Sequence, residues 1–458
     1  MKRFFCCLFA IVAIFTFTSE GREKPNILFV LFDDMGYGEP TSYRPTSLFK
    51  TPNIDRMAKE GMRFTDAHSS AASCTPTRYG FLTGRYPHRI GQFGVLSTFS
   101  PPLIPDTRLT IASYLKRNGY TTACIGKWHL GMNWDRPKTK GKNKTKEKLK
   151  IGEKMTGGPN AIGFEYFYGF THARNFQSVI EQDTVVREVK PVENQPLMIA
   201  RAVDFLKEKS SNIEKPFFLY FPMCPPHKPV VPAPEYVGKG GGGGKGSYGD
   251  WVYQGDSMLG QLLDTLESTG LARKTLVLVS ADNGAAGRDY PPLRDNKGSI
   301  YEGGHREPFL AKWPGMIKPG SKSDQIISIT DIFATCAEII GVPLPDNAGE
   351  DSVSFLDCML EKQVGPFREA SVQQSGKKAF AIRKGKWKLI VHGDNKRELF
   401  DLNLDLGETN NIIRAHPQVA AELASLLQSY LDRGRSTPGK AQPLEYKISL
   451  DEIRFKKK

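Results

Sequence analysis

Apolar, β-rich runs recur along this chain and alternate with stretches of helical spacing. The first run, residues 26–32, is continuously apolar, as in a strand buried on both faces. Later runs at 121–125, 217–221 and 275–280 each follow an amphipathic stretch, at 109–118, 197–207 and 251–267. This alternation predicts an α/β fold whose large, mostly parallel sheet is flanked by helices on both faces.

The pattern changes beyond about residue 343. Residues 379–391 and 398–402 read as strands with turns at 384–385 and 393–394, and residues 417–431 place apolar side chains on one helical face. We therefore predict a small C-terminal subdomain, an antiparallel sheet packed by a helix. The predicted division is a leader at 1–20, a main domain at 24–345 and this subdomain, with a basic tail, at 346–458.

Two insertions have a biased composition. Residues 136–150 are rich in lysine and predict a mobile loop at the mouth of a site, or a solvated loop without a role. Residues 238–246 form a tract of glycines with two lysines and predict a flexible connector.

Polar residues directly follow each of the four predicted strands. Ligands of open α/β sheets bind outside the carboxyl ends of the strands, so we expect these distant segments to converge on one site. The residues at the four strand ends are Asp33 with Asp34, Lys127 with His129, His227, and Asp282 with Asn283.

A further candidate site residue, outside the strand ends, is Cys74 in Cys74-Thr75-Pro76-Thr77-Arg78. Pro76 suits the first helical position, and the helix would end at Gly84. Cys74 would then precede a helix N-terminus, which favours anions, and Arg78 adds a forked cationic donor for an oxyanion. The pattern indicates a nucleophile in an anion cradle, although in isolation it also fits a structural cysteine.

The strand-end residues offer two kinds of chemistry. The oxygen atoms of Asp33, Asp34, Asp282 and Asn283 suit a hard cation, Ca²⁺ or Mg²⁺, although each pair alone also fits a turn or a helix cap. The polar groups that could hold an anion or move protons are Lys127, His129, His227 and Lys297, although each alone also fits a surface position. We interpret the nearby residues 302–304 as structural.

Composition and the N-terminal sequence indicate what kind of partner the protein binds and in which compartment it acts. The net charge of +14 favours polyanions such as nucleic acid, anionic lipid or sulfated glycan. Five cysteines follow the leader without C-x-x-C spacing, which argues against a zinc site or a dense disulfide framework and leaves an unpaired thiol. Met1-Lys2-Arg3 and the apolar run at 4–18 predict a signal peptide or an uncleaved anchor, and no later segment reads as a membrane span.

Together these motifs resemble those of the type I, formylglycine-dependent sulfatases, arylsulfatase A-like members of the alkaline phosphatase-like superfamily. The resemblance covers nearly all of the chain beyond about residue 25. The segments that carry it are residues 26–36, Cys74 to Arg78 with 82–85, residues 126–131, 225–227 and 282–284, and Lys297 with 302–304.

The resemblance implies a mechanism. Cys74 would be oxidised to formylglycine by a formylglycine-generating enzyme, beside a calcium ion held by Asp33, Asp34, Asp282 and Asn283. Metal, Arg78, Lys127 and Lys297 would neutralise the sulfate, and one hydroxyl of the hydrated aldehyde would attack sulfur. His227, with Lys297, would protonate the leaving alcohol. His129 would take the proton of the second hydroxyl, so that the aldehyde re-forms and sulfate leaves.

The prediction is therefore an exported sulfuric ester hydrolase, periplasmic or secreted, acting on a sulfated carbohydrate. We expect no nucleic-acid partner and no stable membrane insertion. Two alternatives remain open at this point: a phosphonate monoester or phosphodiester hydrolase of the same superfamily, and a non-catalytic polyanion-binding protein.

Overall fold

The computed structural model describes residues 24–135, 148–362, 365–376 and 378–450. The predicted signal peptide at 1–20, most of the lysine-rich segment (136–147) and the basic tail at 456–458 lie outside these ranges. Within the described ranges, no helix combines the length and the apolar character that a membrane crossing requires.

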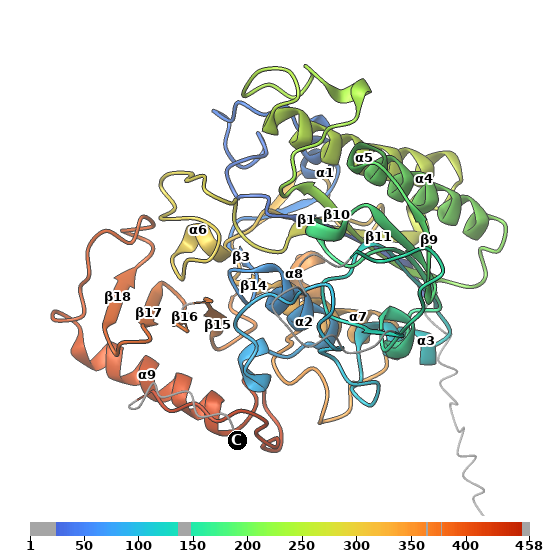
Figure 1. The fold of residues 1–458 in the computed structure, drawn as a ribbon. Coiled ribbons are helices and arrows are strands. Elements are labelled where there is room, and N and C mark those ends of the chain that lie inside the picture. The colour runs from blue at the N-terminus through green and yellow to red at the C-terminus, as the bar shows by residue number, and fades with distance from the viewer. Residues whose placement is uncertain (1–23, 136–147, 363–364, 377, 451–458) are drawn as a thin grey trace, which may run out of the picture.

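A ten-stranded sheet forms the centre of the molecule (Figure 1). Its inner strands are parallel and lie in the order β11 (Thr275–Ala281), β1 (Asn26–Asp33), β10 (Phe217–Pro226), β4 (Thr121–Lys127) and β7 (Tyr166–Phe170). Beyond β11 lie β12 (Phe309–Lys312), β2 (Met62–Phe64) and β13 (Ser321–Ser323), and beyond β7 lie β8 (Ser178–Glu181) and β9 (Thr184–Glu188). The predicted α/β fold is confirmed, and β7 is the inner strand that the sequence pattern did not reveal.

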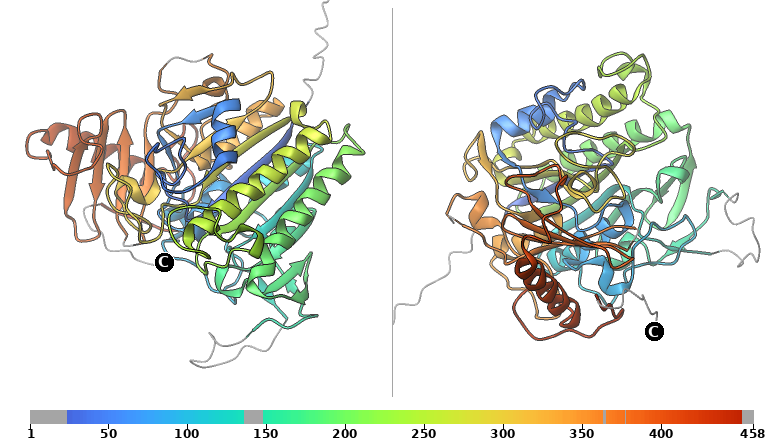
Figure 2. Two further views of the ribbon diagram at one scale, coloured as in Figure 1. Left: turned by 90° about the horizontal axis from the view of Figure 1, so that it is seen from above. Right: turned by 90° about the vertical axis from the view of Figure 1, so that its left-hand side faces the viewer.

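Helices cover both faces of the sheet because both faces of the inner strands are apolar. Along β1, Ile27, Phe29 and Leu31 join one core, and the alternate residues 28, 30 and 32 join the other. One face is covered by α1 (Pro52–Glu60), α4 (Pro191–Ser210) and α5 (Tyr248–Ser268), and the other by α2 (Cys74–Thr83), α3 (Ile111–Arg117), α7 (Ile332–Ile340) and α8 (Leu356–Met359) (Figures 1 and 2). This sandwich holds the strand ends at fixed positions.

The C-terminal sheet packs beside this sandwich (Figure 2). Its antiparallel strands are β15 (Ser371–Gln374), β16 (Phe380–Lys384), β17 (Trp387–Val391) and β18 (Arg397–Asp401), and α9 (Pro417–Asp432) covers one face. The predicted antiparallel sheet and helix are confirmed, and β15 was not predicted. The turn predicted at 384–385 within the segment 379–391 lies at 385–386, between β16 and β17. Tyr86 and Phe93 join the core under α9, and Ile300 and Tyr301 pack on the opposite face. The division near residue 345 stays a prediction.

The glycine-rich segment 238–246 differs from the flexible connector that its composition predicts. It closes around Asp250 in the first turn of α5, whose buried carboxylate accepts hydrogen bonds of 2.8 Å each from the N–H groups of Gly238, Gly240 and Gly246. A Cβ on Gly240 would lie 1.8 Å from the carbonyl oxygen of Gly249. Glycine is therefore needed at position 240 because the segment packs directly against the backbone at the start of α5.

Candidate active site

The strands that carry the predicted site residues, β11, β1, β10 and β4, are neighbours in the sheet. Asp33 and Lys127 are the last residues of β1 and β4. His227 directly follows β10, and Asp282 directly follows β11. Because parallel strands end at the same edge, four segments that are distant in sequence meet there.

Cys74 reaches the same edge at the start of α2. The helix begins two residues earlier than the sequence predicts, because Ser73 rather than Thr75 is its N-cap and the N–H of Thr77 donates to Ser73 O at 3.2 Å. Pro76 fits the third helical position, since N–H groups of the first turn have no partner within the helix. The predicted end is confirmed: Gly84 follows the last turn with a φ of 63°.

The sulfur atom of Cys74 lies between the side chains of an aspartate and a lysine. Its Sγ is 3.3 Å from Asp33 Oδ1 and 3.3 Å from Lys297 Nζ, and the residue is 1% exposed. Burial raises the pKa of the Cys74 thiol strongly, and Asp282 adds to this effect more than Lys127 opposes it. The unmodified side chain is therefore a neutral thiol, which is a poor nucleophile.

Arg78 lies one turn along α2 and is completely buried. Its Nε and Nη2 donate to Asp282 Oδ2 at 3.0 and 2.7 Å, and its Nη1 donates to the carbonyl oxygen of Lys127 at 3.1 Å. Its Nη2 also lies 3.6 Å from Asp33 Oδ1. Arg78 thus links the ends of β11, β4 and β1.

Two lysines complete the balance of charge in the site. Lys127 forms an ion pair with Asp33, and Lys297 forms one with Asp34. Burial alone would raise the pKa of Asp33, but Lys127, His227 and Arg78 outweigh it and hold the pKa well below its ordinary value. With Arg78, the lysines give three cations to match three buried carboxylates, so the site is close to neutral before an anion enters.

Three of the predicted metal ligands are linked by hydrogen bonds, and the N–H of Asp34 donates to Asp282 Oδ1 at 3.1 Å. Asn283 Nδ2 donates to Asp34 Oδ1 at 2.7 Å, whereas Asn283 Oδ1 is buried and has no hydrogen-bond partner among the described residues. Ligand atoms of Asp33, Asp34, Cys74 and His227 lie within 4.8 Å of one another. A buried amide oxygen left unpaired beside carboxylates fits a hard divalent cation.

His129 has one ring nitrogen free for proton transfer. The backbone leaves the extended conformation after Lys127, since His129 has a φ of 60°, so the two side chains do not lie on one face of an extended strand. His129 Nε2 lies 3.0 Å from the carbonyl oxygen of Leu96, to which it must donate, so Nδ1 carries the lone pair and has no partner among the described residues. Burial, with Lys127, holds the pKa of His129 well below its ordinary value.

His172 is a neighbour of the site that the sequence did not reveal. Its ring lies 5.2 Å from that of His129, and its two nitrogens are occupied by Thr98 Oγ1 at 2.8 Å and the N–H of Arg174 at 3.1 Å. Burial, with Lys127 and Arg174, lowers the pKa of His172 to about 4. The available signal was its place just beyond β7, the strand whose aromatic sequence was not recognised.

His227 and Lys297 mark the opening of the site. Their side chains are 23% and 21% exposed, whereas those of Asp33, Arg78 and Lys127 are fully buried. His227 Nε2 lies 3.6 Å from Asp34 Oδ2, and its carbonyl oxygen accepts a 2.9 Å hydrogen bond from Trp251. An incoming anion would therefore meet His227 and Lys297 first.

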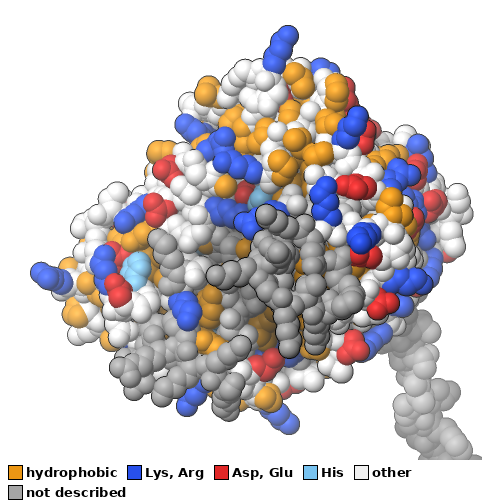
Figure 3. Space-filling view, in the orientation of Figure 1, with side chains coloured by type: hydrophobic (Ala, Val, Ile, Leu, Met, Phe, Trp, Pro, Cys, Tyr) orange, Lys and Arg blue, Asp and Glu red, His pale blue; other side chains and the backbone are white. Residues whose placement is uncertain are grey.

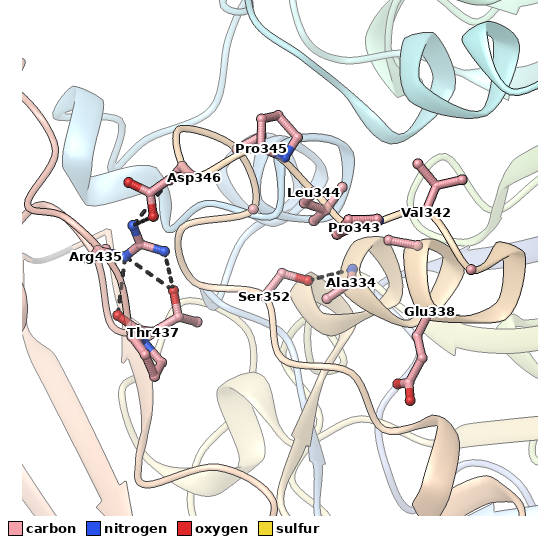
Figure 4. Close-up of a pocket in the computed structure, with 15 residues that line it drawn as sticks. Ala334, Glu338, Val342, Pro343, Leu344, Pro345, Asp346, Ser352, Arg435 and Thr437 are labelled. Atoms are coloured by element: carbon pink, nitrogen blue, oxygen red, sulfur yellow. Dashed lines mark hydrogen bonds and ion pairs between the residues drawn. The ribbon is translucent and has the colours of Figure 1, made fainter. Parts of the chain in front are cut away.

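A separate cavity of about 580 Å³ lies at the end of α7 (Figure 4). Its lining comes from α7, residues 341–352 and residues 435–438, none of which belongs to the predicted site. The guanidinium group of Arg435 in its wall is engaged by Asp346 at 2.8 Å and by Thr437 at 3.0 Å. The guanidinium group of Arg435 is therefore not free to bind a ligand there.

Comparison with known proteins agrees with the geometry at the strand ends. A model of the sulfatase family matches residues 25–342, and a model of the C-terminal region of N-sulphoglucosamine sulphohydrolases matches residues 295–436. An N-acetylgalactosamine-6-O-sulfatase of Bacteroides thetaiotaomicron is 30% identical in an alignment of 488 positions, gaps included, that covers 90% of this chain and 94% of the relative. Arylsulfatase A of Bos taurus is 32% identical over 447 residues, which cover 87% and 85%.

Solved structures show the same architecture. One, described under the metabolism of multiple glycosaminoglycans by Bacteroides thetaiotaomicron, superposes with a TM-score of 0.79 at 28% identity, covering 89% of this chain and 99% of that one. A phosphonate monoester hydrolase of Agrobacterium radiobacter, with a TM-score of 0.62 and 17% identity over 88% of this chain and 95% of that one, shares the fold alone. The chain belongs to the sulfatase family. It is an arylsulfatase A-like enzyme with the alkaline phosphatase-like fold, and its reaction is sulfate ester hydrolysis.

Proposed function

We propose that this enzyme removes sulfate from a sulfated carbohydrate, using a formylglycine made from Cys74 and a divalent cation, Ca²⁺ or Mg²⁺. The observation that carries the proposal is the setting of Cys74 Sγ, buried 3.3 Å from both Asp33 Oδ1 and Lys297 Nζ. A neutral thiol there has little nucleophilic power, whereas a hydrated aldehyde would offer two hydroxyl groups on one carbon. Its formation would need a formylglycine-generating enzyme as a partner.

In this proposal the cation is held by Asp33, Asp34, Asp282 and Asn283. When bound, it would polarise a sulfate oxygen and help to neutralise the ester. The unpaired Asn283 Oδ1 supports this assignment because a buried carbonyl oxygen without a donor is costly unless a cation or water satisfies it.

The remaining residues would bind charge and move protons. Lys297 contacts the sulfur of Cys74, and Arg78 and Lys127 pair with the neighbouring Asp282 and Asp33. These three cations suit the negative charge of a sulfate ester and of its transition state. His227, partly exposed, would donate a proton to the leaving alcohol, assisted by Lys297. His129 would accept a proton at Nδ1, its free nitrogen, when sulfate is released.

The substrate class rests on relatives and on charge. Two relatives that are 30% identical are named as N-acetylgalactosamine-6-O-sulfatase and N-acetylgalactosamine-6-sulfatase, so a sulfated hexosamine is our first candidate. Lys and Arg side chains spread over the face shown in Figure 3, with a group near its centre. With a net charge of +14, such a surface would attract a polyanionic glycan.

We also propose that residues 1–20 direct export to the periplasm or the medium, and that the chain divides near residue 345. The lysines of the segment 136–150 would steer a polyanionic substrate. These proposals rest on the sequence pattern alone.

Peptide mass spectrometry across Cys74 tests the central proposal. Conversion of the thiol to the aldehyde lowers the peptide mass, and a Cys74→Ala variant should lose hydrolysis of sulfated N-acetylgalactosamine. Hydrolysis of a nitrophenyl sulfate should exceed that of the matching phosphate diester. An unmodified Cys74 in a fully active enzyme would refute the mechanism.

A further inference from the structure

The short helix α6 (Glu302–His305) joins three segments that supply the active site. Each segment is tied to it by a backbone hydrogen bond, and the segments lead directly to Asn283, Lys297 and Cys74. The bonds run from the N–H of Gly284 to the carbonyl oxygen of Gly304 (3.1 Å), from the N–H of Gly303 to that of Arg294 (2.9 Å), and from the N–H of Ser69 to that of His305 (2.9 Å).

The backbones around α6 pack without intervening side chains. A Cβ on Gly284 would lie 2.0 Å from the carbonyl oxygen of Gly303, and a Cβ on Gly303 would lie 2.0 Å from that of Asp295. Because closely packed segments move together, a shift of α6 would be passed to all three site segments.

The C-terminal sheet holds α6 in its position. Lys388 of β17 is completely buried, and its Nζ lies 2.9 Å from Glu302 Oε1, 2.7 Å from Glu408 Oε1 and 3.2 Å from His305 Nε2. Glu408 Oε2 accepts a 2.6 Å hydrogen bond from the N–H of Glu302, the first residue of α6. One lysine and one glutamate therefore hold both the side chain and the backbone at the start of α6.

The surrounding polar groups show why a lysine and not a metal fills this space. His68, Glu302 and His305 lie close enough together to ligate an ion. However, Lys388 Nζ contacts both Glu302 and His305, so a cation already occupies the region between them. The cluster extends to His68, 3.1 Å from His305 between Nδ1 atoms, and to Asp66, 2.7 Å from His68.

We propose that Lys388 is a positioning residue for catalysis, which aligns Asn283, Lys297 and Cys74 through Glu302 and α6. The inference rests on the proposed function, since that assigns Asn283 to the cation and Lys297 to the anion. It makes the C-terminal sheet part of the apparatus that aligns the active site.

The test compares Lys388→Met with Lys386→Met in the full-length enzyme. Lys386 precedes the same strand and also pairs with an acid, Asp401 at 2.6 Å, but its side chain is 44% exposed. For Lys388→Met we expect kcat on a nitrophenyl sulfate to fall about 10- to 100-fold well below the unfolding temperature, because a misplacement of about 1 Å can cost about 100-fold. The rise of the thermal midpoint on adding Ca²⁺, measured without substrate, should also shrink, and Lys386→Met should match wild type in both.

Three outcomes would overturn the inference. The first is a Lys388→Met enzyme with a lower thermal midpoint but wild-type kcat and Ca²⁺ response, because the role would then be structural only. If that variant does not fold, Glu302→Gln decides, since it keeps the size of the side chain but removes the charge that Lys388 pairs with; wild-type kcat and Ca²⁺ response there are the second outcome. The third is a wild-type enzyme without sulfatase activity or Ca²⁺ response, which is recognised before any variant is made and refutes the proposed function as well.

Discussion

Replacing Arg78 by methionine should separate the electrostatic role of this residue from its packing. Methionine is apolar, flexible and long enough to fill much of the space of the arginine stem. The substitution removes two hydrogen bonds to Asp282 Oδ2, at 3.0 and 2.7 Å, and leaves that carboxylate buried at 0% exposure. The pKa of Asp282, already raised by burial and by Asp33, should rise further.

The magnitude follows from removing one partner of a buried pair. Such changes typically cost about 3–5 kcal/mol, because the remaining charge has lost its solvent and its partner. The exposed pair Arg56–Asp264, at 2.7 Å with side chains 31% and 68% exposed, offers a control of the same residue types. Arg56→Met should cost about 0–1 kcal/mol, as expected for an ion pair in contact with water.

Urea-induced unfolding of the metal-free enzyme, followed by tryptophan fluorescence, measures both costs. Adding Asp282→Asn to Arg78→Met should recover part of the lost free energy of unfolding, since no uncompensated charge then remains, while sulfatase activity stays lost. Equal costs for the buried and the exposed arginine, or no recovery in the double variant, would refute the electrostatic reasoning.

Three further predictions follow from the same site and its surroundings. Chelation with EDTA should abolish turnover of a nitrophenyl sulfate, and Ca²⁺ or Mg²⁺ should restore it. His129→Ala should lower kcat by about 10²–10⁴-fold, whereas His172→Ala should cost much less, because both nitrogens of His172 are already occupied. Burial raises the pKa of Glu39 from 4.5 to about 7, so ionising it opposes folding and wild-type stability falls as pH rises through that window. Relative to wild type, Glu39→Gln should gain up to about 3 kcal/mol above pH 7 and little near pH 4, as urea unfolding at the two pH values would show.

The features that the sequence predicts well are those written in local pattern. The apolar run of β1 and the helical spacing of α5 identify elements that bury their faces whatever their neighbours are. The position of Asp33 at the end of β1 then follows from the general geometry of parallel sheets. The closeness of Cys74 and Lys297 could not be read from spacing, since 223 residues separate them, and it came only from the family resemblance.

The features that the sequence did not reveal depend on partners far along the chain. In the sequence, Lys388 looks like an ordinary strand lysine. It becomes a buried ion-pair partner only because the fold brings it to Glu302, 86 residues away in the chain. The composition of the segment 238–246 is typical of a linker, and it does not indicate that N–H groups of this segment donate hydrogen bonds to Asp250. Likewise β15 is four residues long and mostly polar, so its burial comes from β16 and not from its own apolar content.

Because the sulfur atom of Cys74 is buried, the residues around it can contact only a small part of the substrate. Apart from His227 and Lys297, the predicted site residues keep their charged atoms away from solvent, so the inner site can grip a small anionic end and little else. Selection among sulfate esters must then be made by groups outside this opening. The buried residues can stay unchanged while those outside the opening vary. Enzymes with the same chemistry could then act on different sulfate esters.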